Sequence, residues 1–468
     1  MAKVVANLSR VLDSVKLDPG DFADLRLTDS QSTSVLIRNG VLEQTGHTHT
    51  CGMAARALVN GAWGFYSTSN STTESARSSL ELAIKMAKAA SRGMGEKAEV
   101  FRDWSFKENV PLHVGIDPRE VSLEEKIKVA ADFEKNIRKV DIRIASSTAA
   151  VGDGVRRDTI SNTLGSIVEC ESCFVRVSGS AVSKEGTLTQ QVSESMASTD
   201  GWEAVERFDT TEKGVQVGTR ARDLLSASPP PSGKMSVVMD PSLVGVYIHE
   251  AFGHAAEADA VKAGTSVLAG KLGKVVGSRE VSVYDDPTIP GAAGSFPFDS
   301  EGTRTARRTI VENGVLMGYL HSLETSSWLK SKPNGAARAM DFSSVPIIRM
   351  SNTFIDASDM KVEELLELVK DGVYLTKSYG GYVDIVRGQF LFSAQGGNVI
   401  RDGKLAESIQ NVSMSGMTLE VLEKTIGIGD RMELAFPGTC GKGGQWVPVN
   451  GGGPNLAVRD IVIGGRGG

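Results

Sequence analysis

The chain has 468 residues, of which 40% are apolar and 23% charged, a composition that excludes general disorder and is typical of a globular protein of two or three domains. Its 51 basic and 57 acidic residues give a net charge of −6, which offers no general attraction for nucleic acid. No apolar run reaches the roughly 20 residues of a membrane span. The N-terminus predicts an amphipathic helix instead of a signal peptide, so we expect a cytoplasmic protein without membrane contact.

The first part of the chain predicts a helix, an antiparallel meander and a second helix. Residues 2–16 are amphipathic, and residues 22–69 alternate polar and apolar side chains as strands do. Turn signals interrupt the alternation at Asn39-Gly40 and Asn60-Gly61. A helix is predicted over about 73–93. These elements form an α+β layer.

The segment 95–120 shows no regular period and divides this half into two candidate subdomains. The pattern resumes at Ser122, which with Glu125 has the spacing of a capping box. The elements expected from there are a helix to about residue 140, strands to about residue 195 and a helix over 210–225.

The main domain boundary is predicted at residues 226–233, SASPPPSG. Three consecutive prolines neither continue a helix nor occupy a central strand. We therefore expect an N-terminal domain of mixed α/β layers over residues 1–228 and a C-terminal domain over residues 234–468. The fold class expected for the whole chain is α+β.

The second half is predicted to be rich in strands. A strand over 235–239 is followed by a helix that begins at Asp240 and has Gly264 as its C-cap. Hairpin turns are predicted at Asn313-Gly314 and Asp402-Gly403. The two further helices expected lie over 361–370 and 418–424.

The helix after Asp240 carries the motif HEAFGH, whose histidines are His249 and His254. Neutral imidazole is the commonest ligand of zinc, and Glu250 beside it is able to take a proton from a metal-bound water. A spacing of five residues separates the two rings by about 140° on an ideal α-helix. Either a wide turn of the π type or a helix break near Gly253 is needed to bring the rings together. Glycine suits both, because it tolerates unusual backbone conformations.

Other residues, near this motif and elsewhere, are candidate ligands or partners of ligands. Glu257 is a candidate hydrogen-bond partner for a ligating histidine, but an exposed carboxylate is the expectation. Cys170 and Cys173 lie in a predicted strand, where residues three apart point to opposite faces, so we expect no metal or redox role. Cys51, with His47 and His49, is expected on a solvent-facing strand edge.

A third ligand is available near the C-terminus, where Cys440 is expected on a glycine-rich loop in the segment GTCGKGGQWVPV. A cysteine between glycines is able to approach a metal closely, and the alternative is a small buried thiol. Two histidines and one cysteine with an open fourth position form a known catalytic zinc arrangement.

With these motifs the sequence resembles the TldD/PmbA family of metallopeptidases, and its TldD branch in particular. The intact His-Glu motif indicates the branch, because the PmbA branch, also called TldE, lacks it. The resemblance extends over nearly the whole chain. The segments that carry it are GMAARA (52–57), WGF (63–65), HEAFGH (249–254), FDSEG (298–302), VENGVLMGY (311–319), PIIRMSNT (346–353), YGGYVD (379–384), GQFLFS (388–393) and GTCGKGGQWVPV (438–449).

The resemblance implies that His249, His254 and Cys440 ligate one zinc ion per chain and that Glu250 is the catalytic carboxylate. It also implies that a TldD-type chain pairs with a TldE-type subunit around an enclosed chamber; a homodimer is the other assembly considered. Small or unfolded peptides are the implied substrates. Two departures concern substrate contacts: Ser300 replaces an expected acidic residue, and segment 334–338 (NGAAR) keeps one of two expected arginines.

The activity expected is hydrolysis of peptide bonds, with zinc polarising the carbonyl and Glu250 acting as general base. The alternative is a non-catalytic peptide-binding scaffold with a structural metal. Direct nucleic-acid binding is not expected, because the chain shows no basic run and no DNA-binding motif. Tyr319, His321 and Arg338 are the candidate oxyanion stabilisers, with structural roles as the alternative.

Overall fold

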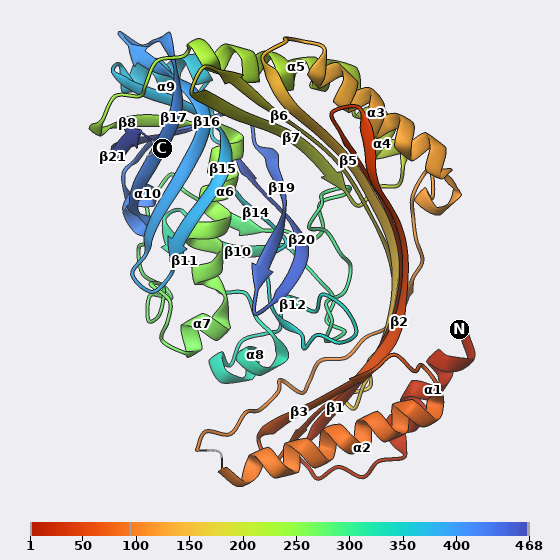
Figure 1. The fold of residues 1–468 in the computed structure, drawn as a ribbon. Coiled ribbons are helices and arrows are strands. Elements are labelled where there is room, and N and C mark those ends of the chain that lie inside the picture. The colour runs from red at the N-terminus through yellow and green to blue at the C-terminus, as the bar shows by residue number, and fades with distance from the viewer. Residues whose placement is uncertain (1, 94, 466–468) are drawn as a thin grey trace.

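The computed structural model describes residues 2–93 and 95–465. Its first part contains a sheet of seven strands, which curves around the second part of the chain (Figure 1). The strands are β1 (Phe22–Arg38), β2 (Val41–Val59), β3 (Ala62–Thr68), β4 (Lys107–Val110), β5 (Ile144–Asn162), β6 (Ile167–Glu185) and β7 (Leu188–Ser198). Their order is β3-β2-β1-β5-β6-β4, with β7 beside β6.

The long strands make this sheet continuous from one end to the other. β1 pairs along its length with β2 on one side and with β5 on the other. The predicted turns are confirmed: Asn39 and Asn60 have φ of 49° and 52°, each followed by a glycine with positive φ. Because β1 and β5 pair directly, the irregular segment 95–120 connects elements of one sheet.

Helices cover the two ends of the sheet (Figure 1). Near one end lie α1 (Ala2–Asp13) and α2 (Thr73–Ala90), and near the other lie α3 (Leu123–Arg138), α4 (Glu203–Arg207) and α5 (Thr210–Asp223). Thr72 caps α2 and Ser122 caps α3, each accepting a backbone N–H. The α+β class expected from the sequence is confirmed.

The second part of the chain contains two six-stranded sheets and a two-stranded one. The first sheet contains β8 (Gly233–Met239), β15 (Gly372–Asp384), β16 (Gln389–Arg401), β17 (Lys404–Met417), β18 (Thr425–Ile428) and β21 (Leu456–Gly465). The second contains β9 (Val283–Asp285), β10 (Arg308–Glu312), β11 (Val315–Leu316), β14 (Asn352–Ile355), β19 (Glu433–Lys442) and β20 (Gln445–Gly453), and β12 (Ala337–Arg338) pairs with β13 (Ile347–Ile348).

The helices of this part are short and confirm the predicted helices near 361–370 and 418–424. The helix predicted from Asp240 to Gly264 is interrupted at Glu257, whose backbone is extended with ψ of 119°. The helices are α6 (Pro241–Val246), α7 (Ala258–Lys262), α8 (Leu323–Leu329), α9 (Val362–Val369) and α10 (Thr418–Glu423). The sequence predicted only strands and turns around α8. This was wrong because the helix is fixed by a capping box between Ser322 and Thr325 and not by an apolar period.

Helix α6 lies between the two larger sheets (Figure 1) and contacts β15, β19 and β20. Leu243, Val244 and Val246 on α6, and Tyr247 and Ile248 after it, are completely buried. The segment that carries HEAFGH is therefore held in the core of this part. No helix among the described residues is long and apolar enough to span a membrane.

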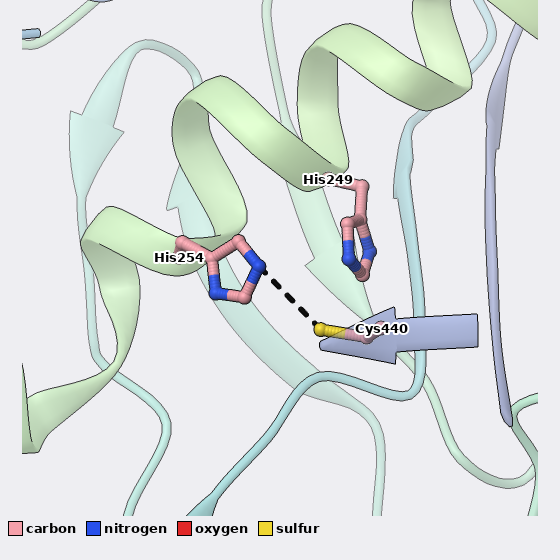
Figure 2. Close-up of side chains that lie close together, drawn as sticks. All are labelled: His249, His254 and Cys440. Atoms are coloured by element: carbon pink, nitrogen blue, oxygen red, sulfur yellow. Dashed lines mark hydrogen bonds between the residues drawn. The ribbon is translucent and has the colours of Figure 1, made fainter. Parts of the chain in front are cut away.

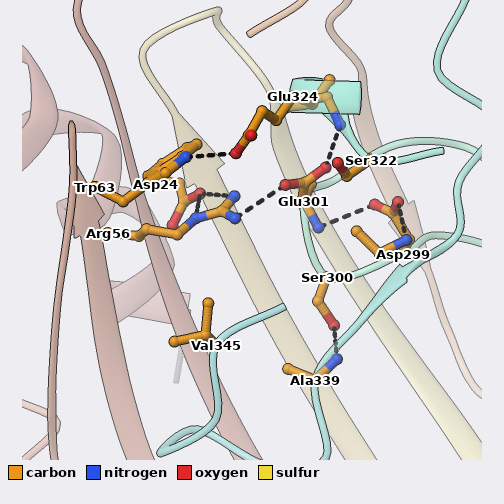
Figure 3. A network of polar contacts seen from close by, with 12 residues as sticks. Asp24, Arg56, Trp63, Asp299, Ser300, Glu301, Ser322, Glu324, Ala339 and Val345 are labelled. Atoms are coloured by element: carbon orange, nitrogen blue, oxygen red, sulfur yellow. Dashed lines mark hydrogen bonds and ion pairs between the residues drawn. The ribbon is translucent and has the colours of Figure 1, made fainter. Parts of the chain in front are cut away.

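A buried ionic network joins the curved sheet to the second part (Figure 3). Arg56 on β2 lies 2.6 Å from Asp24 on β1 and 2.9 Å from Glu301. The other oxygen of Glu301 accepts the N–H of Leu323 at 2.7 Å, at the start of α8. Each charge in the network is paired, which buried charges require.

Candidate metal centre

The helix forms a wider turn at the motif, and this turn brings both histidines to one side of the helix. Tyr247–Gly253 is a π-helical turn, and the N–H of His254 donates to the carbonyl of His249, five residues back. The two rings have centroids 5.3 Å apart. The wide-turn alternative predicted from the five-residue spacing is therefore confirmed.

Gly253 is required here by packing. Its backbone is helical, with φ −60° and ψ −45°, so the glycine relieves no strain. A Cβ at this position would overlap Sδ of Met350. The sequence-based reason for this glycine was wrong, because the contact with Met350 lies far away in the sequence.

Cys440 completes the cluster from the other side (Figure 2). It lies on strand β19 and not on the expected loop; the glycines that follow it form the turn to β20. Its Sγ is 3.4 Å from Nε2 of His254, and one side-chain ligand atom from each of His249, His254 and Cys440 lies within 4.8 Å of the others.

Glu257 holds His254 from behind. It is 1% exposed, and its carboxylate lies 3.0 Å from Nδ1 of His254 and 3.0 Å from Nζ of Lys442. The expectation of an exposed carboxylate was wrong, because Lys442 brings a cation from the end of β19. When a metal is bound, a proton held on Nδ1 by Glu257 would leave the Nε2 lone pair available to ligate it.

The charges of the cluster stabilise one another. Burial raises the pKa of the Cys440 thiol, but His249 and His254 outweigh burial and lower this pKa to about 4. Burial disfavours protonated His254, whereas Glu257 and Cys440 raise its pKa well above the ordinary value. The cluster therefore favours a thiolate, the form of cysteine that binds metals.

The donor set fits a divalent transition metal. One sulfur and two imidazoles suit zinc and its neighbours, whereas calcium and magnesium prefer oxygen ligands. Nδ1 of His249 is buried and has no hydrogen-bond partner among the described residues, as expected for a nitrogen left for another ligand. Among these residues, no fourth His, Cys, Asp or Glu joins the group of three.

Glu250 lies on the accessible side of the cluster. It is the one residue of the π-helical turn that is not buried, and its side chain is 34% exposed. One carboxylate oxygen lies 3.9 Å from Nε2 of His254. A carboxylate in this position reaches both solvent and the cluster.

Two of the candidate oxyanion stabilisers have structural partners. The hydroxyl of Tyr319 donates to the carbonyl of Leu268 at 2.8 Å. The ring nitrogens of His321 lie 3.3 Å from the hydroxyls of Thr325 and Ser331, and burial lowers its pKa to about 4. Both side chains stabilise the fold around α8 and its neighbouring strands.

The two departures from the family pattern lie side by side. The hydroxyl of Ser300 accepts the N–H of Ala339 at 3.0 Å, so it holds the segment that carries Arg338. Nη1 of Arg338 donates to the carbonyl of Met350 at 2.8 Å. Met350 is the residue that packs on Gly253, so Arg338 lies one residue away from the π-helical turn.

The remaining cysteines lie away from the cluster. Cys170 and Cys173 are free and buried on β6, and burial raises the pKa of each to about 12. Their thiols stay protonated at neutral pH, as expected for structural cysteines. The exposed ring of His49, near Cys51 on β2, lies 2.8 Å from Asp29.

Sequence reasoning missed Lys442 and Arg349. Arg349 is completely buried and donates to the carbonyls of Cys440 and Gln445. Lys442 lies in the segment GTCGKGGQ and Arg349 in PIIRMSNT. The signal available in the sequence was a basic residue between glycines and a basic residue within an apolar stretch.

Known proteins share this architecture. A metalloprotease of Methanothermobacter thermautotrophicus is 38% identical over 97% of this chain and 98% of its own. A zinc metalloprotease TldD homolog of Saccharolobus solfataricus is 26% identical over 95% of this chain and 96% of its own. Two solved structures have the same fold. A putative modulator of DNA gyrase from Thermotoga maritima has a TM-score of 0.79 and 23% identity, with 99% of this chain and 98% of its own chain covered. TldE from Thermococcus kodakarensis has a TM-score of 0.78 and 16% identity, with 99% of this chain and 100% of its own chain covered.

Three family models match successive parts of the sequence. The PmbA/TldA metallopeptidase domain 1 matches residues 23–91, the central domain matches residues 116–227 and the C-terminal domain matches residues 232–465. The C-terminal match includes the entire cluster of His249, His254 and Cys440. With these matches and the 38% identity to a metalloprotease over nearly its full length, the chain belongs to the PmbA/TldA metallopeptidase family.

Proposed function

We propose that this chain is a zinc-dependent peptidase of the TldD branch that hydrolyses small or unfolded peptides. One zinc ion is held by His249, His254 and Cys440, and Glu250 is the general base. The observation that carries the proposal is the convergence of these three side chains within 4.8 Å, with the accessible Glu250 beside them. Three protein ligands leave a position for water or substrate, which favours catalysis over a scaffold with a structural metal.

A zinc ion held there would polarise the scissile carbonyl and lower the pKa of a bound water from 15.7 toward about 7. Glu250 accepts the proton of the attacking water on its accessible carboxylate and delivers it to the leaving amine. Glu257 keeps the Nδ1 proton of His254 and so holds the ring in place. The thiolate of Cys440 donates more charge than an imidazole, so catalysis depends more strongly on Glu250.

We propose a TldE-type subunit as the partner. The similarity of this fold to TldE of Thermococcus kodakarensis supports a partner with the same fold. A homodimer is the alternative assembly. The name of the Saccharolobus solfataricus relative, a zinc metalloprotease TldD homolog, supports both zinc and the branch. We also propose functional domains over residues 1–228 and 234–468, divided at the proline-rich segment.

The test combines metal content with cleavage of an unstructured fluorogenic peptide. The chain is measured alone and mixed with a TldE-type subunit from the same source. About one zinc per chain, with cleavage in the mixture, is the expected result. Zinc without cleavage of any of several peptides in either sample would contradict the peptidase and favour the scaffold.

A further inference from the structure

A cavity of about 240 Å³ lies between the curved sheet and the strands that follow Cys440. Side chains from both parts of the chain line it; they include Phe174, Phe296, Ser300, Arg338, Trp446 and Val447. Val447 on β20 is paired directly with Cys440 on β19. The cavity therefore borders the strand pair that carries one of the three clustered ligands.

Arg338 lines this cavity, and its guanidinium has no carboxylate partner in the part of the chain that the structure describes. Its Nη1 donates a hydrogen bond to the carbonyl of Met350, and its Cζ lies 4.6 Å from the ring centroid of Phe296. Within residues 2–93 and 95–465, no carboxylate lies within ion-pair distance of it. Burial, followed by the repulsion from Arg349, lowers its pKa to about 9.

Arg349 adds a second positive charge nearby, and among the described residues it has no carboxylate within ion-pair distance. Its side chain is completely buried, and the hydrogen bonds it makes go to backbone carbonyls, including that of Cys440. Carbonyl oxygens accept its protons but do not neutralise its charge. Two neighbouring guanidinium groups, one of them completely buried and the other partly exposed, are costly unless an anion accompanies them.

The other charges around the cavity do not neutralise Arg338. Cys440 and Asp285 attract it, but Cys440 belongs to the metal cluster and Asp285 is paired with Arg308. Arg156 and Asp158 lie 2.6 Å apart and neutralise each other. Asp299 accepts the N–H groups of three residues, and burial and the charge of Glu301 raise its pKa to about 7. The cavity therefore retains positive charge at Arg338.

We propose that this cavity binds a carboxylate group of the peptide substrate, with Arg338 as the residue that contacts it and Arg349 as the charge behind it. The planar guanidinium offers paired N–H donors that match a carboxylate. The carboxylate comes from the C-terminus of the peptide or from an acidic side chain. The substrate class rests on the proposed function, whereas the carboxylate preference rests on the cavity.

The test measures binding, so that it does not depend on turnover. In the zinc-loaded Glu250→Gln protein, isothermal titration compares acetyl-Ala-Ala-Ala with its C-terminal amide, and acetyl-Ala-Glu-Ala-amide with the Gln peptide. We expect the carboxylate member of at least one pair to bind about tenfold tighter or more, as a charged hydrogen bond predicts. The first pair identifies a C-terminal carboxylate, and the second identifies an acidic side chain.

Variants assign the preference to Arg338. Arg338→Met should abolish the carboxylate preference without weakening the binding of the amide peptide. Arg338→Lys keeps the positive charge but loses the paired N–H donors, so it should reduce the preference severalfold. Arg431→Met is the matched control, because Arg431 is 81% exposed and lies outside the cavity lining. Equal affinities within both pairs, no binding of any peptide, or a preference that survives in Arg338→Met would overturn the proposal.

Peptide cleavage by the unmodified chain with its partner separates the two proposals. Cleavage without any carboxylate preference would refute the cavity assignment alone. A carboxylate preference without cleavage would refute the peptidase and leave the cavity assignment standing.

Discussion

Substituting Glu257 by Gln tests how His254 is held. The change removes one negative charge from a residue that is 1% exposed, and it keeps the size of the side chain. Two contacts of 3.0 Å are affected, one to Nδ1 of His254 and one to Nζ of Lys442. Lys442 keeps Asp259 at 2.6 Å, so the substitution leaves no isolated lysine charge. The effect is therefore directed to His254.

We expect the zinc affinity of Glu257→Gln to fall about 10- to 100-fold, the usual effect of removing a partner behind a ligand. This corresponds to about 1.4 to 2.8 kcal/mol. Competition with a chromophoric chelator measures the Kd. Asp259→Asn is the control, because its carboxylate is 39% exposed and contacts Lys442. Equal zinc Kd values for the two variants, both close to the unmodified value, would refute the role given to Glu257.

Four further outcomes follow from the geometry. Glu250→Gln should retain about one zinc per chain and lose roughly 10²- to 10⁴-fold in kcat; full activity would remove the general-base assignment. Arg56→Met leaves two buried carboxylates without their cation and should lower the free energy of unfolding in urea by about 3 to 5 kcal/mol. An unchanged free energy of unfolding would show that the network does not stabilise the fold. Gly253→Ala should lower the free energy of unfolding by about 1 to 3 kcal/mol. In the background of Met350→Ala the same substitution should lower it by less, because the side chain that a Cβ would overlap is then removed. Because burial lowers the pKa of His321 to about 4, below its usual 6.5, stability rises between these pH values; the neutral ring contributes about 2 kcal/mol more at pH 7.5 than at pH 5. His321→Gln should lose this pH dependence in urea titrations, and an unchanged dependence would contradict it.

Features fixed by neighbouring residues could be predicted from the sequence. The turns at Asn39-Gly40 and Asn313-Gly314 need positive φ at consecutive positions, and Asn-Gly supplies it locally. The prolines after residue 227 end a helix for a reason that is equally local. Strand pairing is different, because alternation shows which side chains share a face and does not identify the neighbouring strand. The curved sheet, in which β1 lies between β2 and β5, therefore emerged only from the structure.

The same limit applies to the site. The five-residue spacing of His249 and His254 was enough to predict a π-type turn, because few helical geometries bring such residues together. Cys440 lies on a strand because β19 pairs with β20, and the burial of Glu257 depends on Lys442, which is distant from both histidines in the sequence. Arg338 could be predicted as a candidate, but its lack of a counter-ion is a property of the folded surroundings.

The π-helical turn is a poor helix by itself, because it replaces regular hydrogen bonds with a wider set. It persists because Tyr247, Ile248 and Phe252 are completely buried between the sheets, which stabilises the turn far more than its own backbone does. Burial on these faces also removes the freedom of His249, while Glu257 and Lys442 restrict His254 from the opposite side. The rings are thus fixed before a metal binds, so little ordering entropy is lost on binding. A helix with four-residue spacing would keep its hydrogen bonds, but it would need a different approach for Cys440.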